Sequence, residues 1–241
     1  GKKYKWVSLK NKNIPLNLLS QSRFDEQKFF NTMIDIKKLN PIYEKIVSYF
    51  EDNEYPFASL SLDSIHIIQD SVFAKLYLDK GPLIQIDSVI LNEDVNISHD
   101  YVTQYLGIKD GSFYNESKIK NINTRIKELS FLQTSYPWKV NFTSTKTTLN
   151  LYLKSKSANR ADVLIGLQPN NQETGGKFLL TGDIKLAFAN ALGQGETFQL
   201  NWQNLQYKSP RYNIIFSVPY LFKTPIGISG KFDFYKKENK C

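Results

Sequence analysis

Residues 178–203 decide the fold, and they read FLLTGDIKLAFANALGQGETFQLNWQ. Apolar and polar residues alternate on both sides of the turn-forming run from Asn190 to Gly195. A period of two is typical of strands with one apolar and one polar face. The alternation extends from Arg160 to Lys237 and predicts about five antiparallel strands. Its apolar positions include Phe178, Leu180, Ile184, Leu186, Phe188, Phe198, Leu200, Trp202, Tyr212, Ile214, Phe216 and Val218.

Two architectures produce this pattern, and they differ in what covers the apolar face. In a soluble sandwich, the apolar face of each sheet is the protein core. In an outer-membrane barrel, the apolar face contacts lipid and the polar face lines the lumen. The alternation alone leaves both open.

Composition excludes several classes of function. The chain has 241 residues and a formal net charge of +8, but its lysines are spread over every segment, which predicts a solvated surface and no nucleic-acid partner. The one cysteine, Cys241, can form neither an internal disulfide nor a cysteine-based metal site. His66 and His99 are the only histidines, so the chain offers few residues from which a catalytic triad could be built. We therefore expect no catalytic residue, no metal and no cofactor, and a protein that is not an enzyme.

The first 157 residues repeat one order of elements, namely strand, helix, helix, strand, strand. The first copy comprises strand 4–9, a helix over 24–34, a helix with Asn40 as N-cap and Pro41 in its first turn, and strands 56–68 and 72–78. The second comprises strand 83–91, helices capped by Ser98 and Asn115, and strands that begin at Trp138 and Leu149. A similar tripeptide occurs at matching points of the two copies, as Tyr55-Pro56-Phe57 and as Tyr136-Pro137-Trp138. Such recurrence indicates tandem modules.

This order resembles the POTRA domain. Glu54-Tyr55-Pro56-Phe57-Ala58 is similar to the start of that family's second strand, and Lys80-Gly81-Pro82 is similar to the junction between successive units. Gly111-Ser112-Phe113-Tyr114 is similar to the turn between the two helices. Two such units before amphipathic strands resemble the outer-membrane protein assembly factors of BamA and TamA type. In that comparison, residues 162–168 match the first barrel strand, and residues 182–195 match the second strand with its periplasmic turn.

The resemblance implies a fold class and a division into domains. The class is α+β, with tandem POTRA domains (β-α-α-β-β) followed by antiparallel transmembrane β-barrel strands. The expected domains are residues 1–80, residues 81–157 next to the barrel, and residues 158–241, which would hold its first strands. A closed bacterial barrel needs at least about eight strands, so the resemblance implies an incomplete barrel and a fragment of a longer protein.

The resemblance also implies a function and a location. POTRA domains in the periplasm would receive unfolded outer-membrane or secreted client polypeptides. The barrel seam would template client insertion into the bacterial outer membrane by β-augmentation. Outer-membrane lipid and possible accessory assembly proteins are the other expected partners. The apolar positions given above would face the lipid.

Three stretches are the candidate strand edges for client binding. The barrel edge comprises Asp162, Val163, Leu164, Ile165, Gly166, Leu167 and Gln168. Val163, Ile165 and Leu167 would point outward and Gly166 inward. Gly166 would either weaken the strand, as a seam that opens requires, or be a small residue of an ordinary strand that faces a crowded lumen. The POTRA edges comprise Pro56, Phe57, Ala58, Ser59, Leu60 and Ser61, and Trp138, Lys139, Val140, Asn141 and Phe142.

Two other functions stay open at this point. One is a secretion pore of the two-partner-secretion type, which would pass a polypeptide through the same architecture. The other, of a different class, is a soluble β-rich interaction protein with two α+β modules and a sandwich, binding an acidic partner through the charge of +8.

Overall fold

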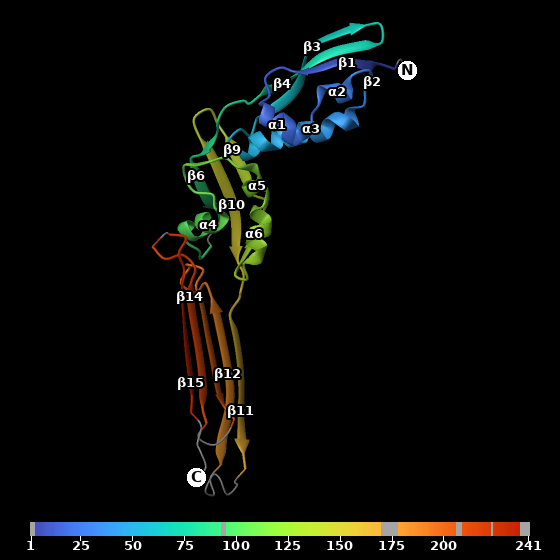
Figure 1. The fold of residues 1–241 in the computed structure, drawn as a ribbon. Helices are drawn as coiled ribbons and strands as arrows, with labels where there is room; N and C mark the ends of the chain where they lie inside the picture. Colours follow the sequence, from blue (N-terminus) through green and yellow to red (C-terminus); the bar gives the residue numbers. More distant parts are fainter. Residues whose placement is uncertain (1–2, 93–94, 170–177, 206–208, 223, 237–241) are drawn as a thin grey trace. The chain divides into compact units, whose positions relative to one another are not determined.

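The structure is a computed structural model, and it describes residues 3–92, 95–169, 178–205, 209–222 and 224–236 (Figure 1). The chain divides into two compact units. The first unit holds Gly1–Asp87, Gly111–Lys120 and Thr143–Thr147; the second holds Ser88–Asp110, Asn121–Phe142 and Thr148–Cys241. Short stretches of the predicted second domain thus belong to the first unit. The predicted boundaries after residues 80 and 157 stay predictions.

The first unit is built on a four-stranded sheet in the order β2-β1-β4-β3. Its strands are β1 (Lys5–Asn11), β2 (Thr32–Met33), β3 (Ser59–Ile68) and β4 (Ser71–Asp79), and its first three helices are α1 (Leu16–Ser22), α2 (Glu26–Phe29) and α3 (Ile36–Asp52). β1 runs parallel to β4, and the other neighbours are antiparallel. Alternate residues of β4 form one core with one stripe of α3, because both are apolar on the sides that meet. This core includes Val72, Ala74, Leu76, Leu78, Leu39, Ile42, Ile46 and Phe50.

Two predictions about the helices of this unit are wrong. The expected helix over residues 24–34 is the short α2 followed by β2, because Asn31 adopts a left-handed φ of 53° and turns the chain back toward β1. The expected N-cap at Asn40 is also wrong. α3 begins at Ile36, where Asp35 accepts a hydrogen bond from the Lys37 amide, and Pro41 lies inside the helix. α1 lies within residues 10–22, a stretch in which no element is predicted from the sequence.

The second repeat contributes to both units. β5 (Gln85–Ile86), β7 (Ser112–Phe113) and α5 (Glu116–Lys120) belong to the first unit. In the second unit, β6 (Ser88–Asn92) runs parallel to β10 (Thr147–Ser155), which also pairs with β8 (Leu132–Thr134) and β9 (Lys139–Phe142). The helices of the second unit are α4 (His99–Leu106) and α6 (Ile122–Glu128). Both predicted caps are present, since Ser98 accepts from the Tyr101 amide at 3.1 Å and Asn115 from the Lys118 amide at 2.9 Å.

The last strands form a five-stranded antiparallel sheet in sequence order. They are β11 (Arg160–Gln168), β12 (Leu179–Ala189), β13 (Thr197–Asn204), β14 (Arg211–Val218) and β15 (Ile228–Tyr235). Each pairs with the next over most of its length. The sheet stays open, with β11 and β15 as its outermost strands in the described part of the chain (Figure 1).

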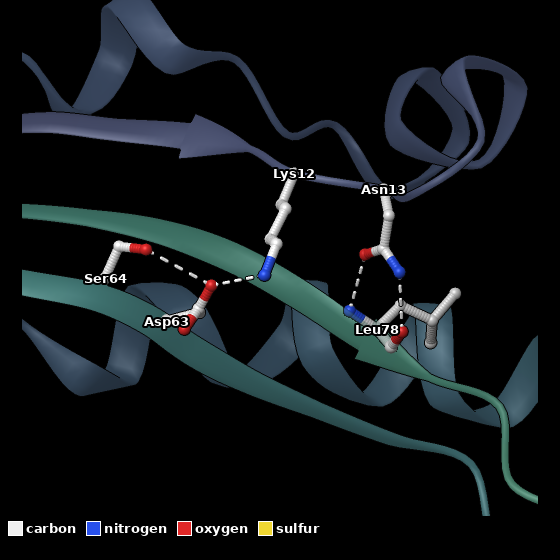
Figure 2. A network of polar contacts seen from close by, with 5 residues as sticks. All are labelled: Lys12, Asn13, Asp63, Ser64 and Leu78. Carbon is white, nitrogen blue, oxygen red and sulfur yellow. Dashed lines mark hydrogen bonds and ion pairs between the residues drawn. The ribbon is translucent and has the colours of Figure 1, made fainter.

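A side-chain amide extends the sheet of the first unit where β1 ends. Asn13 accepts a hydrogen bond from the Leu78 amide at 2.8 Å and donates to the Leu78 carbonyl at 2.7 Å (Figure 2). This pair of bonds is what a neighbouring strand residue would make. Beside it, Lys12 pairs with Asp63 at 2.5 Å, and this hydrogen bond lowers the pKa of the exposed Asp63 carboxyl (Figure 2).

Replacing Asn13 should destabilise the first unit. Asn13→Ala leaves both main-chain groups of Leu78 without their partner, and Leu78 is only 2% exposed, so we expect a loss of about 1–3 kcal/mol. The measurement is hydrogen exchange at the Leu78 amide together with urea unfolding. Lys12→Met is the control, because the exposed ion pair that it removes contributes little. Equal losses in the two variants would contradict the role given to Asn13.

Candidate functional site

The strand registers of the five-stranded sheet place the predicted apolar positions on one face. One row crosses all five strands, in which each residue is paired with the next: Val163, Ile184, Trp202, Tyr212 and Phe234. The next row is Ala161, Leu186, Leu200, Ile214 and Phe232. A third row joins Phe188, Phe198, Phe216 and Gly230. Paired residues of antiparallel strands share a face, so these rows form one apolar surface, which we call the apolar face.

No part of the described chain covers the apolar face. The buried hydrophobic side chains of the described residues end with Leu153, before the sheet begins. On the sheet itself, Phe216 is 41% exposed, Leu180 54% and Phe178, just before β12, 73%. A soluble sandwich would bury such side chains under a second sheet. The described residues provide no such layer.

The opposite face of the sheet is polar and internally hydrogen-bonded. Asn201 donates to Asn213 at 3.1 Å, and Asn213 donates to Asp233 at 2.5 Å, so amides connect three neighbouring strands. Gln203 likewise donates to Asp183 at 3.0 Å. These side chains suit contact with water.

β11 is paired on one side only in the described part of the chain. Its pairing with β12 runs from Arg160 opposite Ala187 to Gln168 opposite Leu179. The predicted barrel edge, residues 162–168, lies within this outermost strand. Its backbone groups on the side away from β12 therefore have no strand partner among the described residues.

Gly166 has a role that sequence reasoning missed. It lies opposite Thr181 on the polar face, where the Thr181 hydroxyl donates to the Gly166 carbonyl at 3.1 Å. An added Cβ at residue 166 would lie 2.8 Å from that hydroxyl oxygen. The absence of a side chain lets the hydroxyl reach the backbone. Since the partner lies on another strand, no local pattern could have revealed this contact.

The two predicted POTRA edges lie at outermost strands of two other sheets. Pro56, Phe57 and Ala58 precede β3, whereas Ser59, Leu60 and Ser61 open it. Trp138 precedes β9, which contains Lys139, Val140, Asn141 and Phe142. β3 pairs with β4 and β9 with β10. The three predicted edges are thus in three separate sheets.

The exposed half of β3 was not predicted as part of an edge. β3 continues to Ile68, past an irregularity between Asp63 and His66. Ile65, Ile67 and Ile68 are 51%, 59% and 63% exposed. The signal was the three isoleucines of Ile65-His66-Ile67-Ile68, since the adjacent pair at 67 and 68 breaks the alternation.

Ionisable side chains in the described residues have structural surroundings. No group of three or more His, Cys, Asp or Glu side chains in this part of the chain could hold a metal ion. His99 lies 2.9 Å from the Val89 carbonyl and 3.7 Å from Asp110, which ties α4 to β6. Burial raises the pKa of Tyr105 to about 12, and its hydrogen bond to Glu128 acts in the same direction. Among the described helices, none has the length and apolar character needed to cross a membrane.

Comparison with solved structures finds a similar fold. BamA from Haemophilus ducreyi lacking POTRA domains 1–3 matches with a TM-score of 0.56 and 16% identity, over 96% of this chain and 43% of that one. CdiB from Acinetobacter baumannii gives a TM-score of 0.47 and 10% identity, over 90% of this chain and 41% of that one. The chain therefore spans less than half the length of either. No protein-family model and no curated protein sequence matches it.

The likeness to BamA shows the fold alone at this level of identity. It supports the coarse prediction of a mixed α+β chain with several sheets, similar in fold to BamA. The finer description as two complete POTRA domains stays a prediction.

Proline substitutions test whether the edge of β11 is free. Amides of an antiparallel strand point alternately to its two sides, and proline removes one amide donor. Of Leu164→Pro and Ile165→Pro, we expect one to remove a bond to β12 and the other to leave the sheet intact. Hydrogen exchange of the β12 amides distinguishes them. Equal loss of β12 protection in both variants would contradict an arrangement in which only alternate amides of β11 bond β12.

Proposed function

We propose that the chain is part of an outer-membrane protein that inserts other polypeptides into that membrane. In this proposal, the five-stranded sheet lies in the bilayer and the modules with helices lie in the periplasm. The observation that carries it is the apolar face, whose rows are in register across five strands and uncovered by the described chain. The fold similarity to BamA supports the same assignment.

Lipid is the occupant that best fits the apolar face. Transfer of apolar surface from water to hydrocarbon contributes roughly 25 cal/mol for each Å². Monomeric soluble proteins rarely expose a large continuous apolar patch. Strands that cross an outer membrane need about 9–11 residues. β11 and β12 have 9 and 11, and β13, β14 and β15 have 8 each. The polar face, with its connected amides, then contacts the water of a lumen.

The edge of β11 gives this sheet its proposed activity. An unpaired backbone N–H or C=O in hydrocarbon costs several kcal/mol. A free edge at that depth must therefore pair with some strand, either one of the protein's own or one from another chain. An incoming segment that exchanges onto β11 gains a row of hydrogen bonds. Its apolar side chains then lie on the apolar face.

The proposed clients are unfolded outer-membrane polypeptides with alternating apolar and polar residues. Such segments match the period of β11, in which Val163, Ile165 and Leu167 lie on the apolar face. The activity consists of backbone pairing, so the proposal involves no covalent chemistry and no cofactor. The edges at β3 and β9 are proposed to hold extended clients before insertion.

Cysteine crosslinking in the whole protein tests this function. Cysteines replace Val163, Ile165 and Leu167 one at a time in a Cys241→Ser background, during synthesis of an outer-membrane client that carries cysteines along one strand. We expect disulfides between β11 and that strand. Leu200→Cys is the matched control, because Leu200 also lies on the apolar face but on central strand β13, which has strands on both sides.

Two results would reject the proposal. One is capture of only the protein's own strands during active assembly. The other is equal capture of the client at residue 200. A client that crosslinks in transit and then leaves the membrane would indicate secretion instead of insertion.

A further inference from the structure

The turn between β12 and β13, residues 190–196, is closed by its own polar groups. The Glu196 carboxylate accepts from the Leu192 amide at 2.6 Å and from the Gln194 amide at 3.0 Å. The Asn190 side chain accepts from the Gly195 amide at 2.8 Å, and the Asn190 amide donates to the Glu196 carbonyl at 2.7 Å. Glu196 is 4% exposed and Asn190 8%. The turn is therefore ordered by its own bonds, unlike an exposed hairpin tip.

The same turn is hydrogen-bonded to the segment that begins α4. Asn190 donates through its side-chain amide to the Asn96 carbonyl at 2.6 Å. The Ser98 amide donates to the Gly193 carbonyl at 2.7 Å. Ser98 is the N-cap of α4, and this bond gives its own amide a partner outside the helix. Two bonds of opposite direction thus connect residues far apart in the sequence.

Tyr101 fills the space that the turn leaves open. An added Cβ at Gly195 would lie 2.0 Å from Cε2 of the Tyr101 ring, so any side chain there would displace the ring. Gly195 also has a φ of +69°, which disfavours other residues independently. The ring is 4% exposed, and its centroid lies 5.9 Å from that of Phe131 and 5.5 Å from that of Tyr220, in the loop after β14. Burial raises the pKa of Tyr101, so its phenol stays neutral.

We propose that residues 190–196 form a clasp that fixes the segment 96–101 to the end of the β12–β13 hairpin, with Tyr101 as its anchor. The clasp combines two hydrogen bonds, one buried ring and one position that admits only glycine. It makes the start of α4 and the hairpin a single body. If the sheet acts as proposed above, the clasp also keeps α4 beside the membrane surface, a consequence that rests on the proposed function. The existence of the clasp does not rest on that function.

Two variants of the whole protein, studied by hydrogen exchange, test the clasp. Gly195→Ala should displace the Tyr101 ring and lower the protection of the Ser98 amide about tenfold or more. Asn190→Asp keeps the acceptor for the Gly195 amide but loses the donor to the Asn96 carbonyl. It should therefore lower protection at Ser98 without changing the centre of β13. The matched control is Gly230→Ala on β15, where an added Cβ meets nothing within 4 Å, and protection should be unchanged.

Each outcome either supports or overturns the clasp. Wild-type protection at Ser98 in both variants would overturn it. Gly195→Ala alone could weaken the whole hairpin, so Asn190→Asp decides in that case. Loss confined to Ser98 and the turn supports the clasp, whereas loss throughout β12 and β13 means that the turn serves only to fold the hairpin. These readouts do not depend on client insertion, so failure of the proposed function leaves them interpretable.

Discussion

The structure depends on the in-phase register of five antiparallel strands. Because the side-chain period of a strand is two, a slip by one residue in any pair would move one strand's apolar residues to the other face. The pairs Val163–Ile184, Ile184–Trp202 and Trp202–Tyr212 are all in phase. The result is one apolar and one polar face, and the described chain covers neither with a second sheet. A surface of this kind is stable where a solvent of low polarity meets one side of it.

The other features follow from placing such a sheet in hydrocarbon. Its polar side chains connect across strands through Asn201, Asn213 and Asp233, which suits a hydrated interior. At that depth its outermost strand would need a partner for its backbone groups, which is why strand exchange is the activity that we propose. The turn at residues 190–196 has a different role, because it connects the sheet to the segment 96–101, which belongs to a part of the chain with a protein core. Buried Glu196 orders the turn through local contacts, and the ring of Tyr101 packs against Gly195 from a distant segment.

Much of this architecture could be predicted from the sequence, because its signals are local. Alternation located the last five strands, and the caps at Ser98 and Asn115 follow from single side chains that bond the amide three residues ahead. The failures have non-local or conformational causes. The helical spacing of residues 24–34 does not show that Asn31 adopts the left-handed backbone conformation that separates α2 from β2. The contact between Gly195 and Tyr101 joins two distant segments, so the glycine could be recognised only as a turn residue.

The central claim is that the apolar face contacts acyl chains, and Trp202 offers the most direct test. Fluorescence of the whole protein is compared with that of its Trp202→Phe variant in bilayers whose acyl chains carry bromine, so that the difference isolates Trp202. The account predicts strong quenching of this difference signal by the brominated chains and little quenching by aqueous iodide. Quenching by iodide without quenching by the brominated chains would contradict it.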